Sequence, residues 1–198
     1  KTRAGAEISD FLEKQFVKYT ENHHCLKDSE SAPPGKTKNP WDVKTFFEIG
    51  AHREEIWIDF KALKVSSVDS NPDIGTPNKI INFIQAGNFY LVYRFVYYQE
   101  KGHELEFVKH DDAYTKNYFL KDISATFRRN PKNQLQVNIS APPTYRTREE
   151  FIELLLQKMT ESHRRQIEIA NKGLEKSAAI KDGLIAINKS SEEKIKNL

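Results

Sequence analysis

The chain has 198 residues, of which 38% are hydrophobic, 11% aromatic and 30% charged, with a formal net charge of +3. This length suits one domain with a substantial core, and the aromatic content excludes a disordered chain. A single cysteine, Cys25, excludes an internal disulfide and favours a reducing compartment. With no membrane-spanning apolar run and no secretory pattern at the start, we expect a cytoplasmic protein without a membrane partner.

The first predicted element is an amphipathic helix over residues 7–20, with apolar side chains at helical spacing on one face. The polar stretch of residues 22–38 contains Pro33-Pro34-Gly35 and predicts a long loop, of the kind that is often functional. His23, His24 and Cys25 are metal-ligand types, but three consecutive residues without distant partners do not make a tetrahedral zinc site.

A β-hairpin is predicted over residues 41–65. The run of residues 56–63 is mostly apolar and β-prone, and a turn near Gly50 and Ala51 connects it to the preceding strand. With that turn Asp42 lies opposite Asp59, and directly opposed residues have Cβ atoms about 5 Å apart. Period two also places Lys61 on the same face as Asp59. The prediction depends on register, because a slip of one residue would turn one acid to the other face.

Two close carboxylates and a lysine suit a hard-cation site that acts on phosphate esters. A carboxylate and an ammonium within an apolar strand are costly unless they pair or bind something. Magnesium takes oxygen ligands and needs only one or two protein carboxylates, leaving room for water and a substrate phosphate. Lys61 could then orient the attacking water or stabilise the charge of the transition state. A hairpin that carries only a salt bridge is the alternative.

These three residues resemble the motif of the PD-(D/E)xK nucleases, which include many restriction endonucleases. Asp42 corresponds to the first acid, Asp59 to the second and Lys61 to the lysine. Trp41 stands where the family formula has proline, and Pro40 comes one position earlier. The resemblance covers about residues 5–110 and implies the family's fold, Mg²⁺ as cofactor and DNA as substrate.

The remaining elements follow the strand–helix–strand order of an α/β core. Thr76-Pro77 provides an N-cap and an N1 proline for a helix that is expected to end near Gly87. Residues 89–98 are almost wholly apolar or aromatic and predict a strand buried on both faces. Residues 105–108 are expected to return beside it.

The C-terminal part is predicted to be mainly helical. The alternation over residues 135–139 indicates a half-buried strand, and a capping box over residues 147–150 starts a helix. From residue 162 onward a thin apolar stripe is interrupted by Gly173 and Gly183, so separate helical segments are predicted. We expect this stripe to pack on its own domain or to extend a larger dimer surface, not to dimerise alone.

Three further groups are candidates for support of the site. The resemblance implies that Glu7, in the first helix, supports the metal or bridges to a partner, although the helix dipole also favours an acid there. It implies that Gln85, in the second helix, touches the site or the DNA backbone, although an exposed helix residue is the favoured alternative. His110-Asp111-Asp112 is a rival acidic cluster whose adjacent acids would point to opposite faces of a strand.

Two basic clusters are candidates for DNA contacts. Lys36 and Lys38 precede Asp42, whereas Arg128, Arg129 and Lys132 lie among Asn and Gln residues. Arginine and amide side chains read base edges, and lysine mostly neutralises phosphate. Solvated basic loops are the alternative.

The fold class expected for residues 1–198 is a single α/β, restriction-endonuclease-like domain: a central mixed β-sheet flanked by helices, with C-terminal helices. The catalytic core would span about residues 5–110, and a DNA-contacting, helical part about residues 111–198. The resemblance implies a Mg²⁺-dependent endonuclease, with type II restriction of double-stranded DNA by a homodimer as the first expectation. A repair or recombination nuclease of the same fold and a non-catalytic DNA-binding module are the alternatives.

Overall fold

The computed structural model describes residues 4–33, 41–67, 71–86, 90–124, 126, 128–129 and 134–196. The chain divides into two compact units, Lys1–Leu155 and Leu156–Leu198. Among the described residues, no helix combines the length and the apolar character needed to cross a bilayer.

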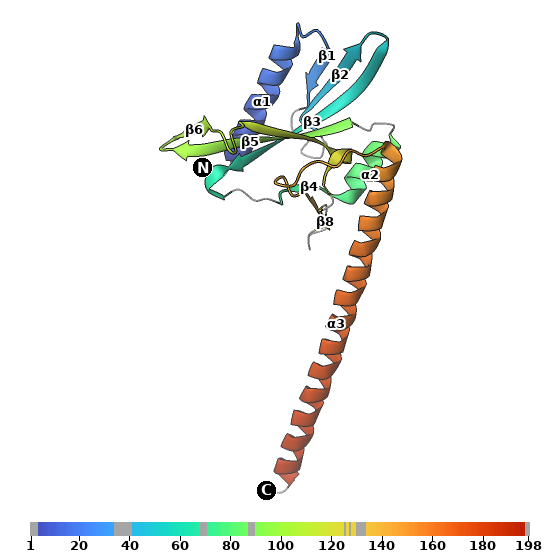
Figure 1. The fold of residues 1–198 in the computed structure, drawn as a ribbon. Helices are drawn as coiled ribbons and strands as arrows, with labels where there is room; N and C mark the ends of the chain where they lie inside the picture. The colour runs from blue at the N-terminus through green and yellow to red at the C-terminus, as the bar shows by residue number, and fades with distance from the viewer. Residues whose placement is uncertain are drawn as a thin grey trace. The chain divides into compact units, whose positions relative to one another are not determined.

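A central mixed sheet forms the framework of the first unit (Figure 1). Its path runs through β1 (Leu26–Ser31), β2 (Val43–Ile49), β3 (His52–Lys64), β5 (Tyr90–Lys101) and β6 (Glu104–Phe107), and β7 (Thr115–Phe119) also pairs with β5. Strands β3 and β5 are parallel, whereas the other pairs are antiparallel. Because parallel neighbours need a crossover, the chain between them carries β4 (Asp73–Gly75) and α2 (Pro77–Gln85). The predicted mixed α/β sheet is confirmed.

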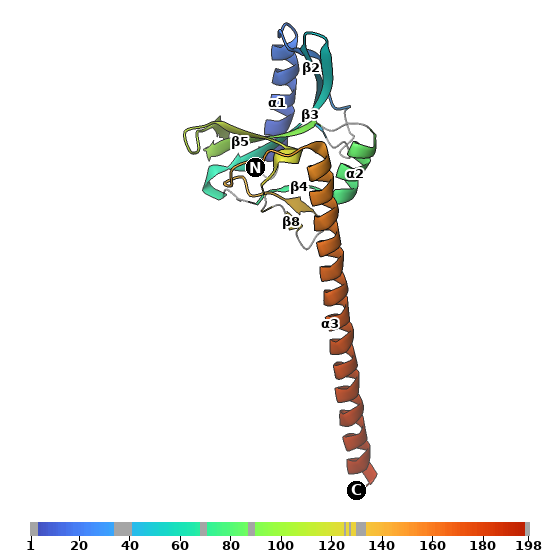
Figure 2. The ribbon, with the colours of Figure 1, turned by 45° about the vertical axis from the view of Figure 1, so that its right-hand side comes forward.

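Helix α1 (Ala4–Thr20) covers one face of this sheet and lies alongside β1–β3 in both views (Figures 1 and 2). Its apolar face packs against side chains of β2, β3 and β5: Leu12, Phe16 and Val17 meet Val43, Ile58, Phe60 and Val96. The helix predicted over residues 7–20 is confirmed and begins three residues earlier. Burial of this face is what fixes α1 on the sheet, because helix stability in proteins comes mostly from such packing.

Alternate side chains of β5 point to the opposite face of the sheet and are also buried. Tyr93, Phe95 and Tyr97 are each at most 2% exposed, and so is Leu91. A small second sheet is ordered β4–β9–β8, with β9 at Leu135–Gln136 and β8 at Arg128–Arg129. A hydrogen bond from Tyr93 Oη to the carbonyl of Ile74, in β4, connects this sheet to β5. The strand is therefore buried on both faces, as its sequence predicts.

The prediction of a loop throughout residues 22–38 is wrong, because β1 pairs antiparallel with β2 as an edge strand. Its sequence is polar and its burial irregular, so it lacks the alternation that identifies a half-buried strand. Hydrogen bonds between hydroxyl groups hold the strand in place: Ser29 Oγ lies 2.7 Å from Thr20 Oγ1, on α1, and 2.8 Å from Thr45 Oγ1, on β2. An edge strand held by such contacts leaves little hydrophobic signal in the sequence.

Helix α3 (Arg148–Lys196) begins at the predicted capping box. The backbone amide of Glu150 donates to Thr147 Oγ1 at 3.2 Å, and the amide of Thr147 donates to Glu150 Oε2 at 2.7 Å. The predicted breaks at Gly173 and Gly183 are wrong, because α3 continues through both. A glycine within an exposed helix costs only about 1 kcal/mol relative to alanine, which a helix of this length tolerates.

Candidate active site

The β2–β3 hairpin has the register on which the site prediction depends. Ile49 pairs with His52 and Val43 with Ile58, so the turn is Gly50-Ala51, with Gly50 at φ 58°. The amide of Asp42 donates to the carbonyl of Ile58 at 2.8 Å, which extends the pairing beyond β2. Asp42 therefore lies level with Asp59, as predicted.

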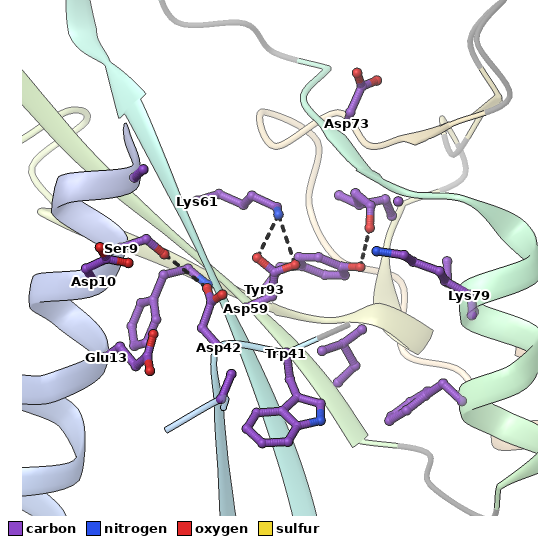
Figure 3. Close-up of a pocket in the computed structure, with 18 of the residues that line it drawn as sticks. Ser9, Asp10, Glu13, Trp41, Asp42, Asp59, Lys61, Asp73, Lys79 and Tyr93 are labelled. Atoms are coloured by element: carbon purple, nitrogen blue, oxygen red, sulfur yellow. Dashed lines mark hydrogen bonds and ion pairs between the residues drawn. The ribbon is translucent and has the colours of Figure 1, made fainter. Parts of the chain in front are cut away.

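A cavity of about 760 Å³ opens over these residues (Figure 3). It is lined from α1, the 41–42 segment, β3, β4, α2 and β5 by residues that include Ser9, Asp10, Glu13, Lys14, Trp41, Asp42, Asp59, Lys61, Asp73, Lys79, Tyr93 and Gln134. The two acids and the lysine that were predicted to converge thus face one space.

Asp42 is held by both α1 and β3. Its Oδ2 accepts hydrogen bonds from Ser9 Oγ at 3.1 Å and from the backbone amide of Phe60 at 2.7 Å. Within the described part of the chain, no hydrogen bond to its Oδ1 is found. One carboxylate oxygen therefore fixes the side chain, and the other remains for a ligand.

Asp59 and Lys61 form a close ion pair on the cavity side of β3 (Figure 3). Lys61 Nζ lies 2.7 Å from Asp59 Oδ1 and 2.9 Å from Oδ2, and the Asp59 side chain is only 15% exposed. Burial raises the pKa of Asp59 to about 6, and the nearby Asp42 carboxylate adds to this, while Lys61 opposes it. The Asp59 carboxyl therefore changes charge close to neutral pH.

This titration predicts a pH-dependent stability change in Asp59→Asn, measured in EDTA. The folded pKa of about 6 exceeds the ordinary value of 3.8, so the favourable contribution of the protonated carboxyl is lost as pH rises through 6. Asparagine resembles the neutral form. Above pH 7 the variant should gain at most about 3 kcal/mol in free energy of unfolding over the parent, and this gain should shrink towards pH 4.

Urea denaturation at pH 4.5, 6 and 8 measures this difference. Glu104→Gln, at an exposed position of β6, is the control for removing an acid. A gain for Asp59→Asn that is the same at all three pH values would contradict the prediction.

Two acids of α1 join the site without having been predicted. Asp10 and Glu13 line the cavity beside Asp42, and burial raises the pKa of Glu13, to which the Asp42 and Asp10 carboxylates add. Positions 6, 9, 10 and 13 share one helical face, so this spacing was the available signal. Glu7 is exposed and does not line the cavity, so its supporting role stays a prediction.

Tyr93 connects the floor of the cavity to the chain that leads into α2. The buried ring lies 5.9 Å from Lys61 Nζ, and its hydroxyl donates to the Ile74 carbonyl. Tyr93→Phe should leave that carbonyl without its donor and lower the free energy of unfolding by about 1–3 kcal/mol.

Tyr97→Phe is the matched control for this substitution. Tyr97 is a fully buried tyrosine four residues along the same strand, and its hydroxyl has no hydrogen-bond partner among the described residues. Its removal should be neutral or stabilising in the same urea titration. Equal losses of unfolding free energy in both variants would show that the hydrogen bond to Ile74 does not contribute to stability.

The other predicted site residues lie away from the cavity or outside the described residues. Gln85 is exposed on α2, and Arg128 is exposed on β8. His110-Asp111-Asp112 forms a turn closed by a bridge from His110 to Ala113. The predicted DNA contacts Lys36, Lys38 and Lys132 lie outside the described residues, as does the side chain of Arg129.

A protein-family model of SwaI-like proteins, described as SwaI restriction endonuclease, matches residues 1–177. The chain belongs to the SwaI-like restriction endonuclease family. A search of curated proteins finds no match. Membership identifies this SwaI-like chain as a restriction nuclease with DNA as its class of substrate, and confirms the predicted restriction-endonuclease-like fold. The matched range includes every residue of the cavity.

Restriction endonucleases generally use Mg²⁺, so the oxygen atoms in this SwaI-like cavity can be compared with the ligands that this ion prefers. Among the described residues, no group of three or more His, Cys, Asp or Glu side chains is placed to enclose a metal. Mg²⁺ does not need such a group, because it is usually bound by one or two carboxylates together with water and substrate phosphate. Asp42, with one oxygen fixed and one remaining, and the adjacent Asp59 fit this open mode of binding.

Proposed function

We propose that this chain is a Mg²⁺-dependent type II restriction endonuclease that cuts double-stranded DNA at a specific site as a homodimer. The observation that carries the proposal is the meeting of Asp42, Asp59 and Lys61 in one cavity, at the register that their spacing requires. Membership of the SwaI-like family supports the reaction class.

Asp42 and Asp59 would hold the metal. A bound Mg²⁺ would polarise the phosphoryl oxygen and lower the pKa of the attacking water. Ser9 and the Phe60 amide keep Asp42 in place, so this carboxylate is positioned before substrate arrives. The pKa of Asp59, about 6, leaves it ionised and ready to bind at pH 7–8.

Lys61 would act on the reacting atoms. Its ammonium is paired with Asp59 and faces the same cavity. From there Lys61 Nζ would donate to the attacking water or to a phosphate oxygen, stabilising negative charge that develops in the transition state. The Lys61 ammonium also lies over the ring of Tyr93, 5.9 Å from its centroid.

Lys79 would bind phosphate from the other side of the cavity. It belongs to the first turn of α2, and Figure 3 shows it opposite α1, with Asp59 between them. Its positive charge acts on Asp59 without forming an ion pair within the described residues. A lysine that is not committed to a carboxylate can neutralise DNA phosphate. Lys36, Lys38, Arg128, Arg129 and Lys132 remain proposed DNA contacts.

A non-catalytic DNA-binding module is the second candidate. The two-oxygen contact between Lys61 and Asp59 is what a strand with a purely structural ion pair would also contain. In that case both residues would stabilise β3 and the cavity would bind DNA without cutting it.

Digestion of a phage genome of known sequence separates these functions. The protein is incubated with the DNA in Mg²⁺ or in EDTA, and the fragment ends are mapped. Discrete fragments with a shared end sequence, in Mg²⁺ alone, are expected. A continuous smear would indicate a nonspecific or repair nuclease, and DNA that is bound but uncut would support the binding module.

A further inference from the structure

The second unit consists of helix α3 from Leu156 onward, and it exposes many large aliphatic side chains. Eight of them are between 44% and 70% exposed: Leu156, Ile167, Ile169, Leu174, Ile180, Leu184, Ile185 and Ile187. An apolar surface of this kind, flanked by charged residues, marks a contact with another molecule or another part of the chain. A long helix also gains most of its stability from such contacts.

Most of these side chains fall on two separate stripes. The first stripe comprises Leu156, Ile167, Leu174 and Ile185, whose spacings of 11, 7 and 11 residues are each close to whole turns. The second stripe comprises Ile169, Ile180 and Ile187, about 140° away around the helix at 100° per residue. The two stripes therefore lie on different faces and can be tested independently.

The spacing of the first stripe is symmetric: it is 11, 7 and 11 residues counted from either end. When two copies of α3 lie antiparallel about a two-fold axis, Leu156 of one copy faces Ile185 of the second, and Ile167 faces Leu174. All four aliphatic side chains of each copy then meet an aliphatic partner. An isologous contact needs this self-complementarity. The second stripe, with spacings of 11 and 7, does not have it.

The charges beside the first stripe favour the same arrangement. Arg164 and Glu175 lie on one flank of the stripe, and the antiparallel register brings Arg164 within two residues, about 3 Å along the axis, of Glu175 in the second copy. The two-fold axis repeats this pair. In a parallel arrangement Arg164 of one copy and Glu175 of the second would instead be 11 residues, about 16 Å, apart along the axis and could not pair. Arg165 and Lys176 also become level in the antiparallel register, but they lie on the far side of the helix.

We propose that the first stripe is a homodimer contact, in which a second copy of this chain packs its α3 antiparallel against it. This deepens the homodimer of the proposed function by assigning it a surface, but it does not require that the cavity cut DNA. The aliphatic composition of the stripe excludes DNA phosphate as its occupant.

Sedimentation velocity on the full chain tests the stripe. Ile167→Asp/Leu174→Asp should weaken self-association at least 100-fold, leaving monomer at concentrations where the parent is a dimer. Ile169→Asp/Ile180→Asp is the matched control on the second stripe and should remain dimeric. A monomeric parent, a dimeric first-stripe variant or equal weakening of both variants would overturn the proposal.

Cysteine cross-linking tests the register and direction. In a Cys25→Ser background, Ile167→Cys/Leu174→Cys should form a covalent dimer on oxidation, whereas each single cysteine should not. Efficient dimer from Leu174→Cys alone would indicate a parallel pair and overturn the antiparallel register. Absence of any dimer would show that the stripe packs on its own chain.

The DNA digest is run in parallel so that the two proposals can fail separately. A cross-linked dimer that does not cut DNA would refute the proposed function and leave the stripe assignment standing. If the parent cuts DNA and the first-stripe variant is still a dimer, the stripe assignment is refuted and the proposed function stands.

Discussion

Asp42→Asn and Asp59→Asn are each expected to reduce the rate of DNA cleavage by at least about 1,000-fold, the upper range for removing one electrostatic partner of a transition state. Each substitution keeps the size of the side chain and removes the charge that would hold the cation. For Asp42 the amide can still accept the hydrogen bonds from Ser9 and Phe60, so the fold around it should persist. Cleavage is measured on plasmid DNA in single-turnover conditions.

DNA binding is the control that separates a lost site from a lost fold. Both variants should bind DNA at least as tightly as the parent in EDTA, because without metal the removal of a negative charge from the cavity reduces repulsion of phosphate. Glu104→Gln, on exposed β6, should cut at the parent rate. An Asp59→Asn protein that cuts nearly as fast as the parent would refute the assignment.

Lys61→Met should reduce kcat by about 100-fold and change KM little, because the ammonium would act on charge that develops only in the transition state. A second effect follows from the ion pair. Lys61 lowers the pKa of Asp59, so its removal should raise that pKa further above 6 and move the acidic limb of the cleavage profile to higher pH.

The pH profile distinguishes this explanation from simple destabilisation. Lys61→Arg, which keeps a positive charge beside Asp59, should retain the position of the acidic limb even if its rate falls. A Lys61→Met enzyme with a reduced rate but an unmoved acidic limb would argue against the coupling between the two side chains.

The central site was predictable because its geometry is local. Asp42 and Asp59 belong to one hairpin, and a two-residue turn at Gly50 together with strand periodicity fixes which residues oppose each other. The acids of α1 were not predictable in the same way. Asp10 and Glu13 reach the cavity because of the way the apolar face of α1 is seated on the sheet, and the rotation of a helix on a sheet depends on packing that a single sequence does not specify.

The errors elsewhere have different physical origins. Strand β1 was missed because hydroxyl contacts and one neighbouring strand hold it, so its sequence shows no apolar alternation. In α3 the glycines at 173 and 183 were given too much weight against the helix-favouring residues around them. Because α3 is continuous, the apolar residues from Leu156 to Ile185 line up on one face of a single helix. Separate helical segments would not keep them aligned.

Both tryptophans of the chain lie at the same place. Trp41 lines the cavity, its ring centroid is 5.7 Å from that of Trp57, and Trp57 in turn lies 4.4 Å from Phe83 of α2. The indole of Trp57 also donates to the Glu55 carboxylate, so its surroundings are polar on one side and aromatic on the other. The tryptophan emission of the unmodified protein therefore originates beside Asp42, and a titration with cation or DNA can be followed by selective excitation of tryptophan without attaching a dye.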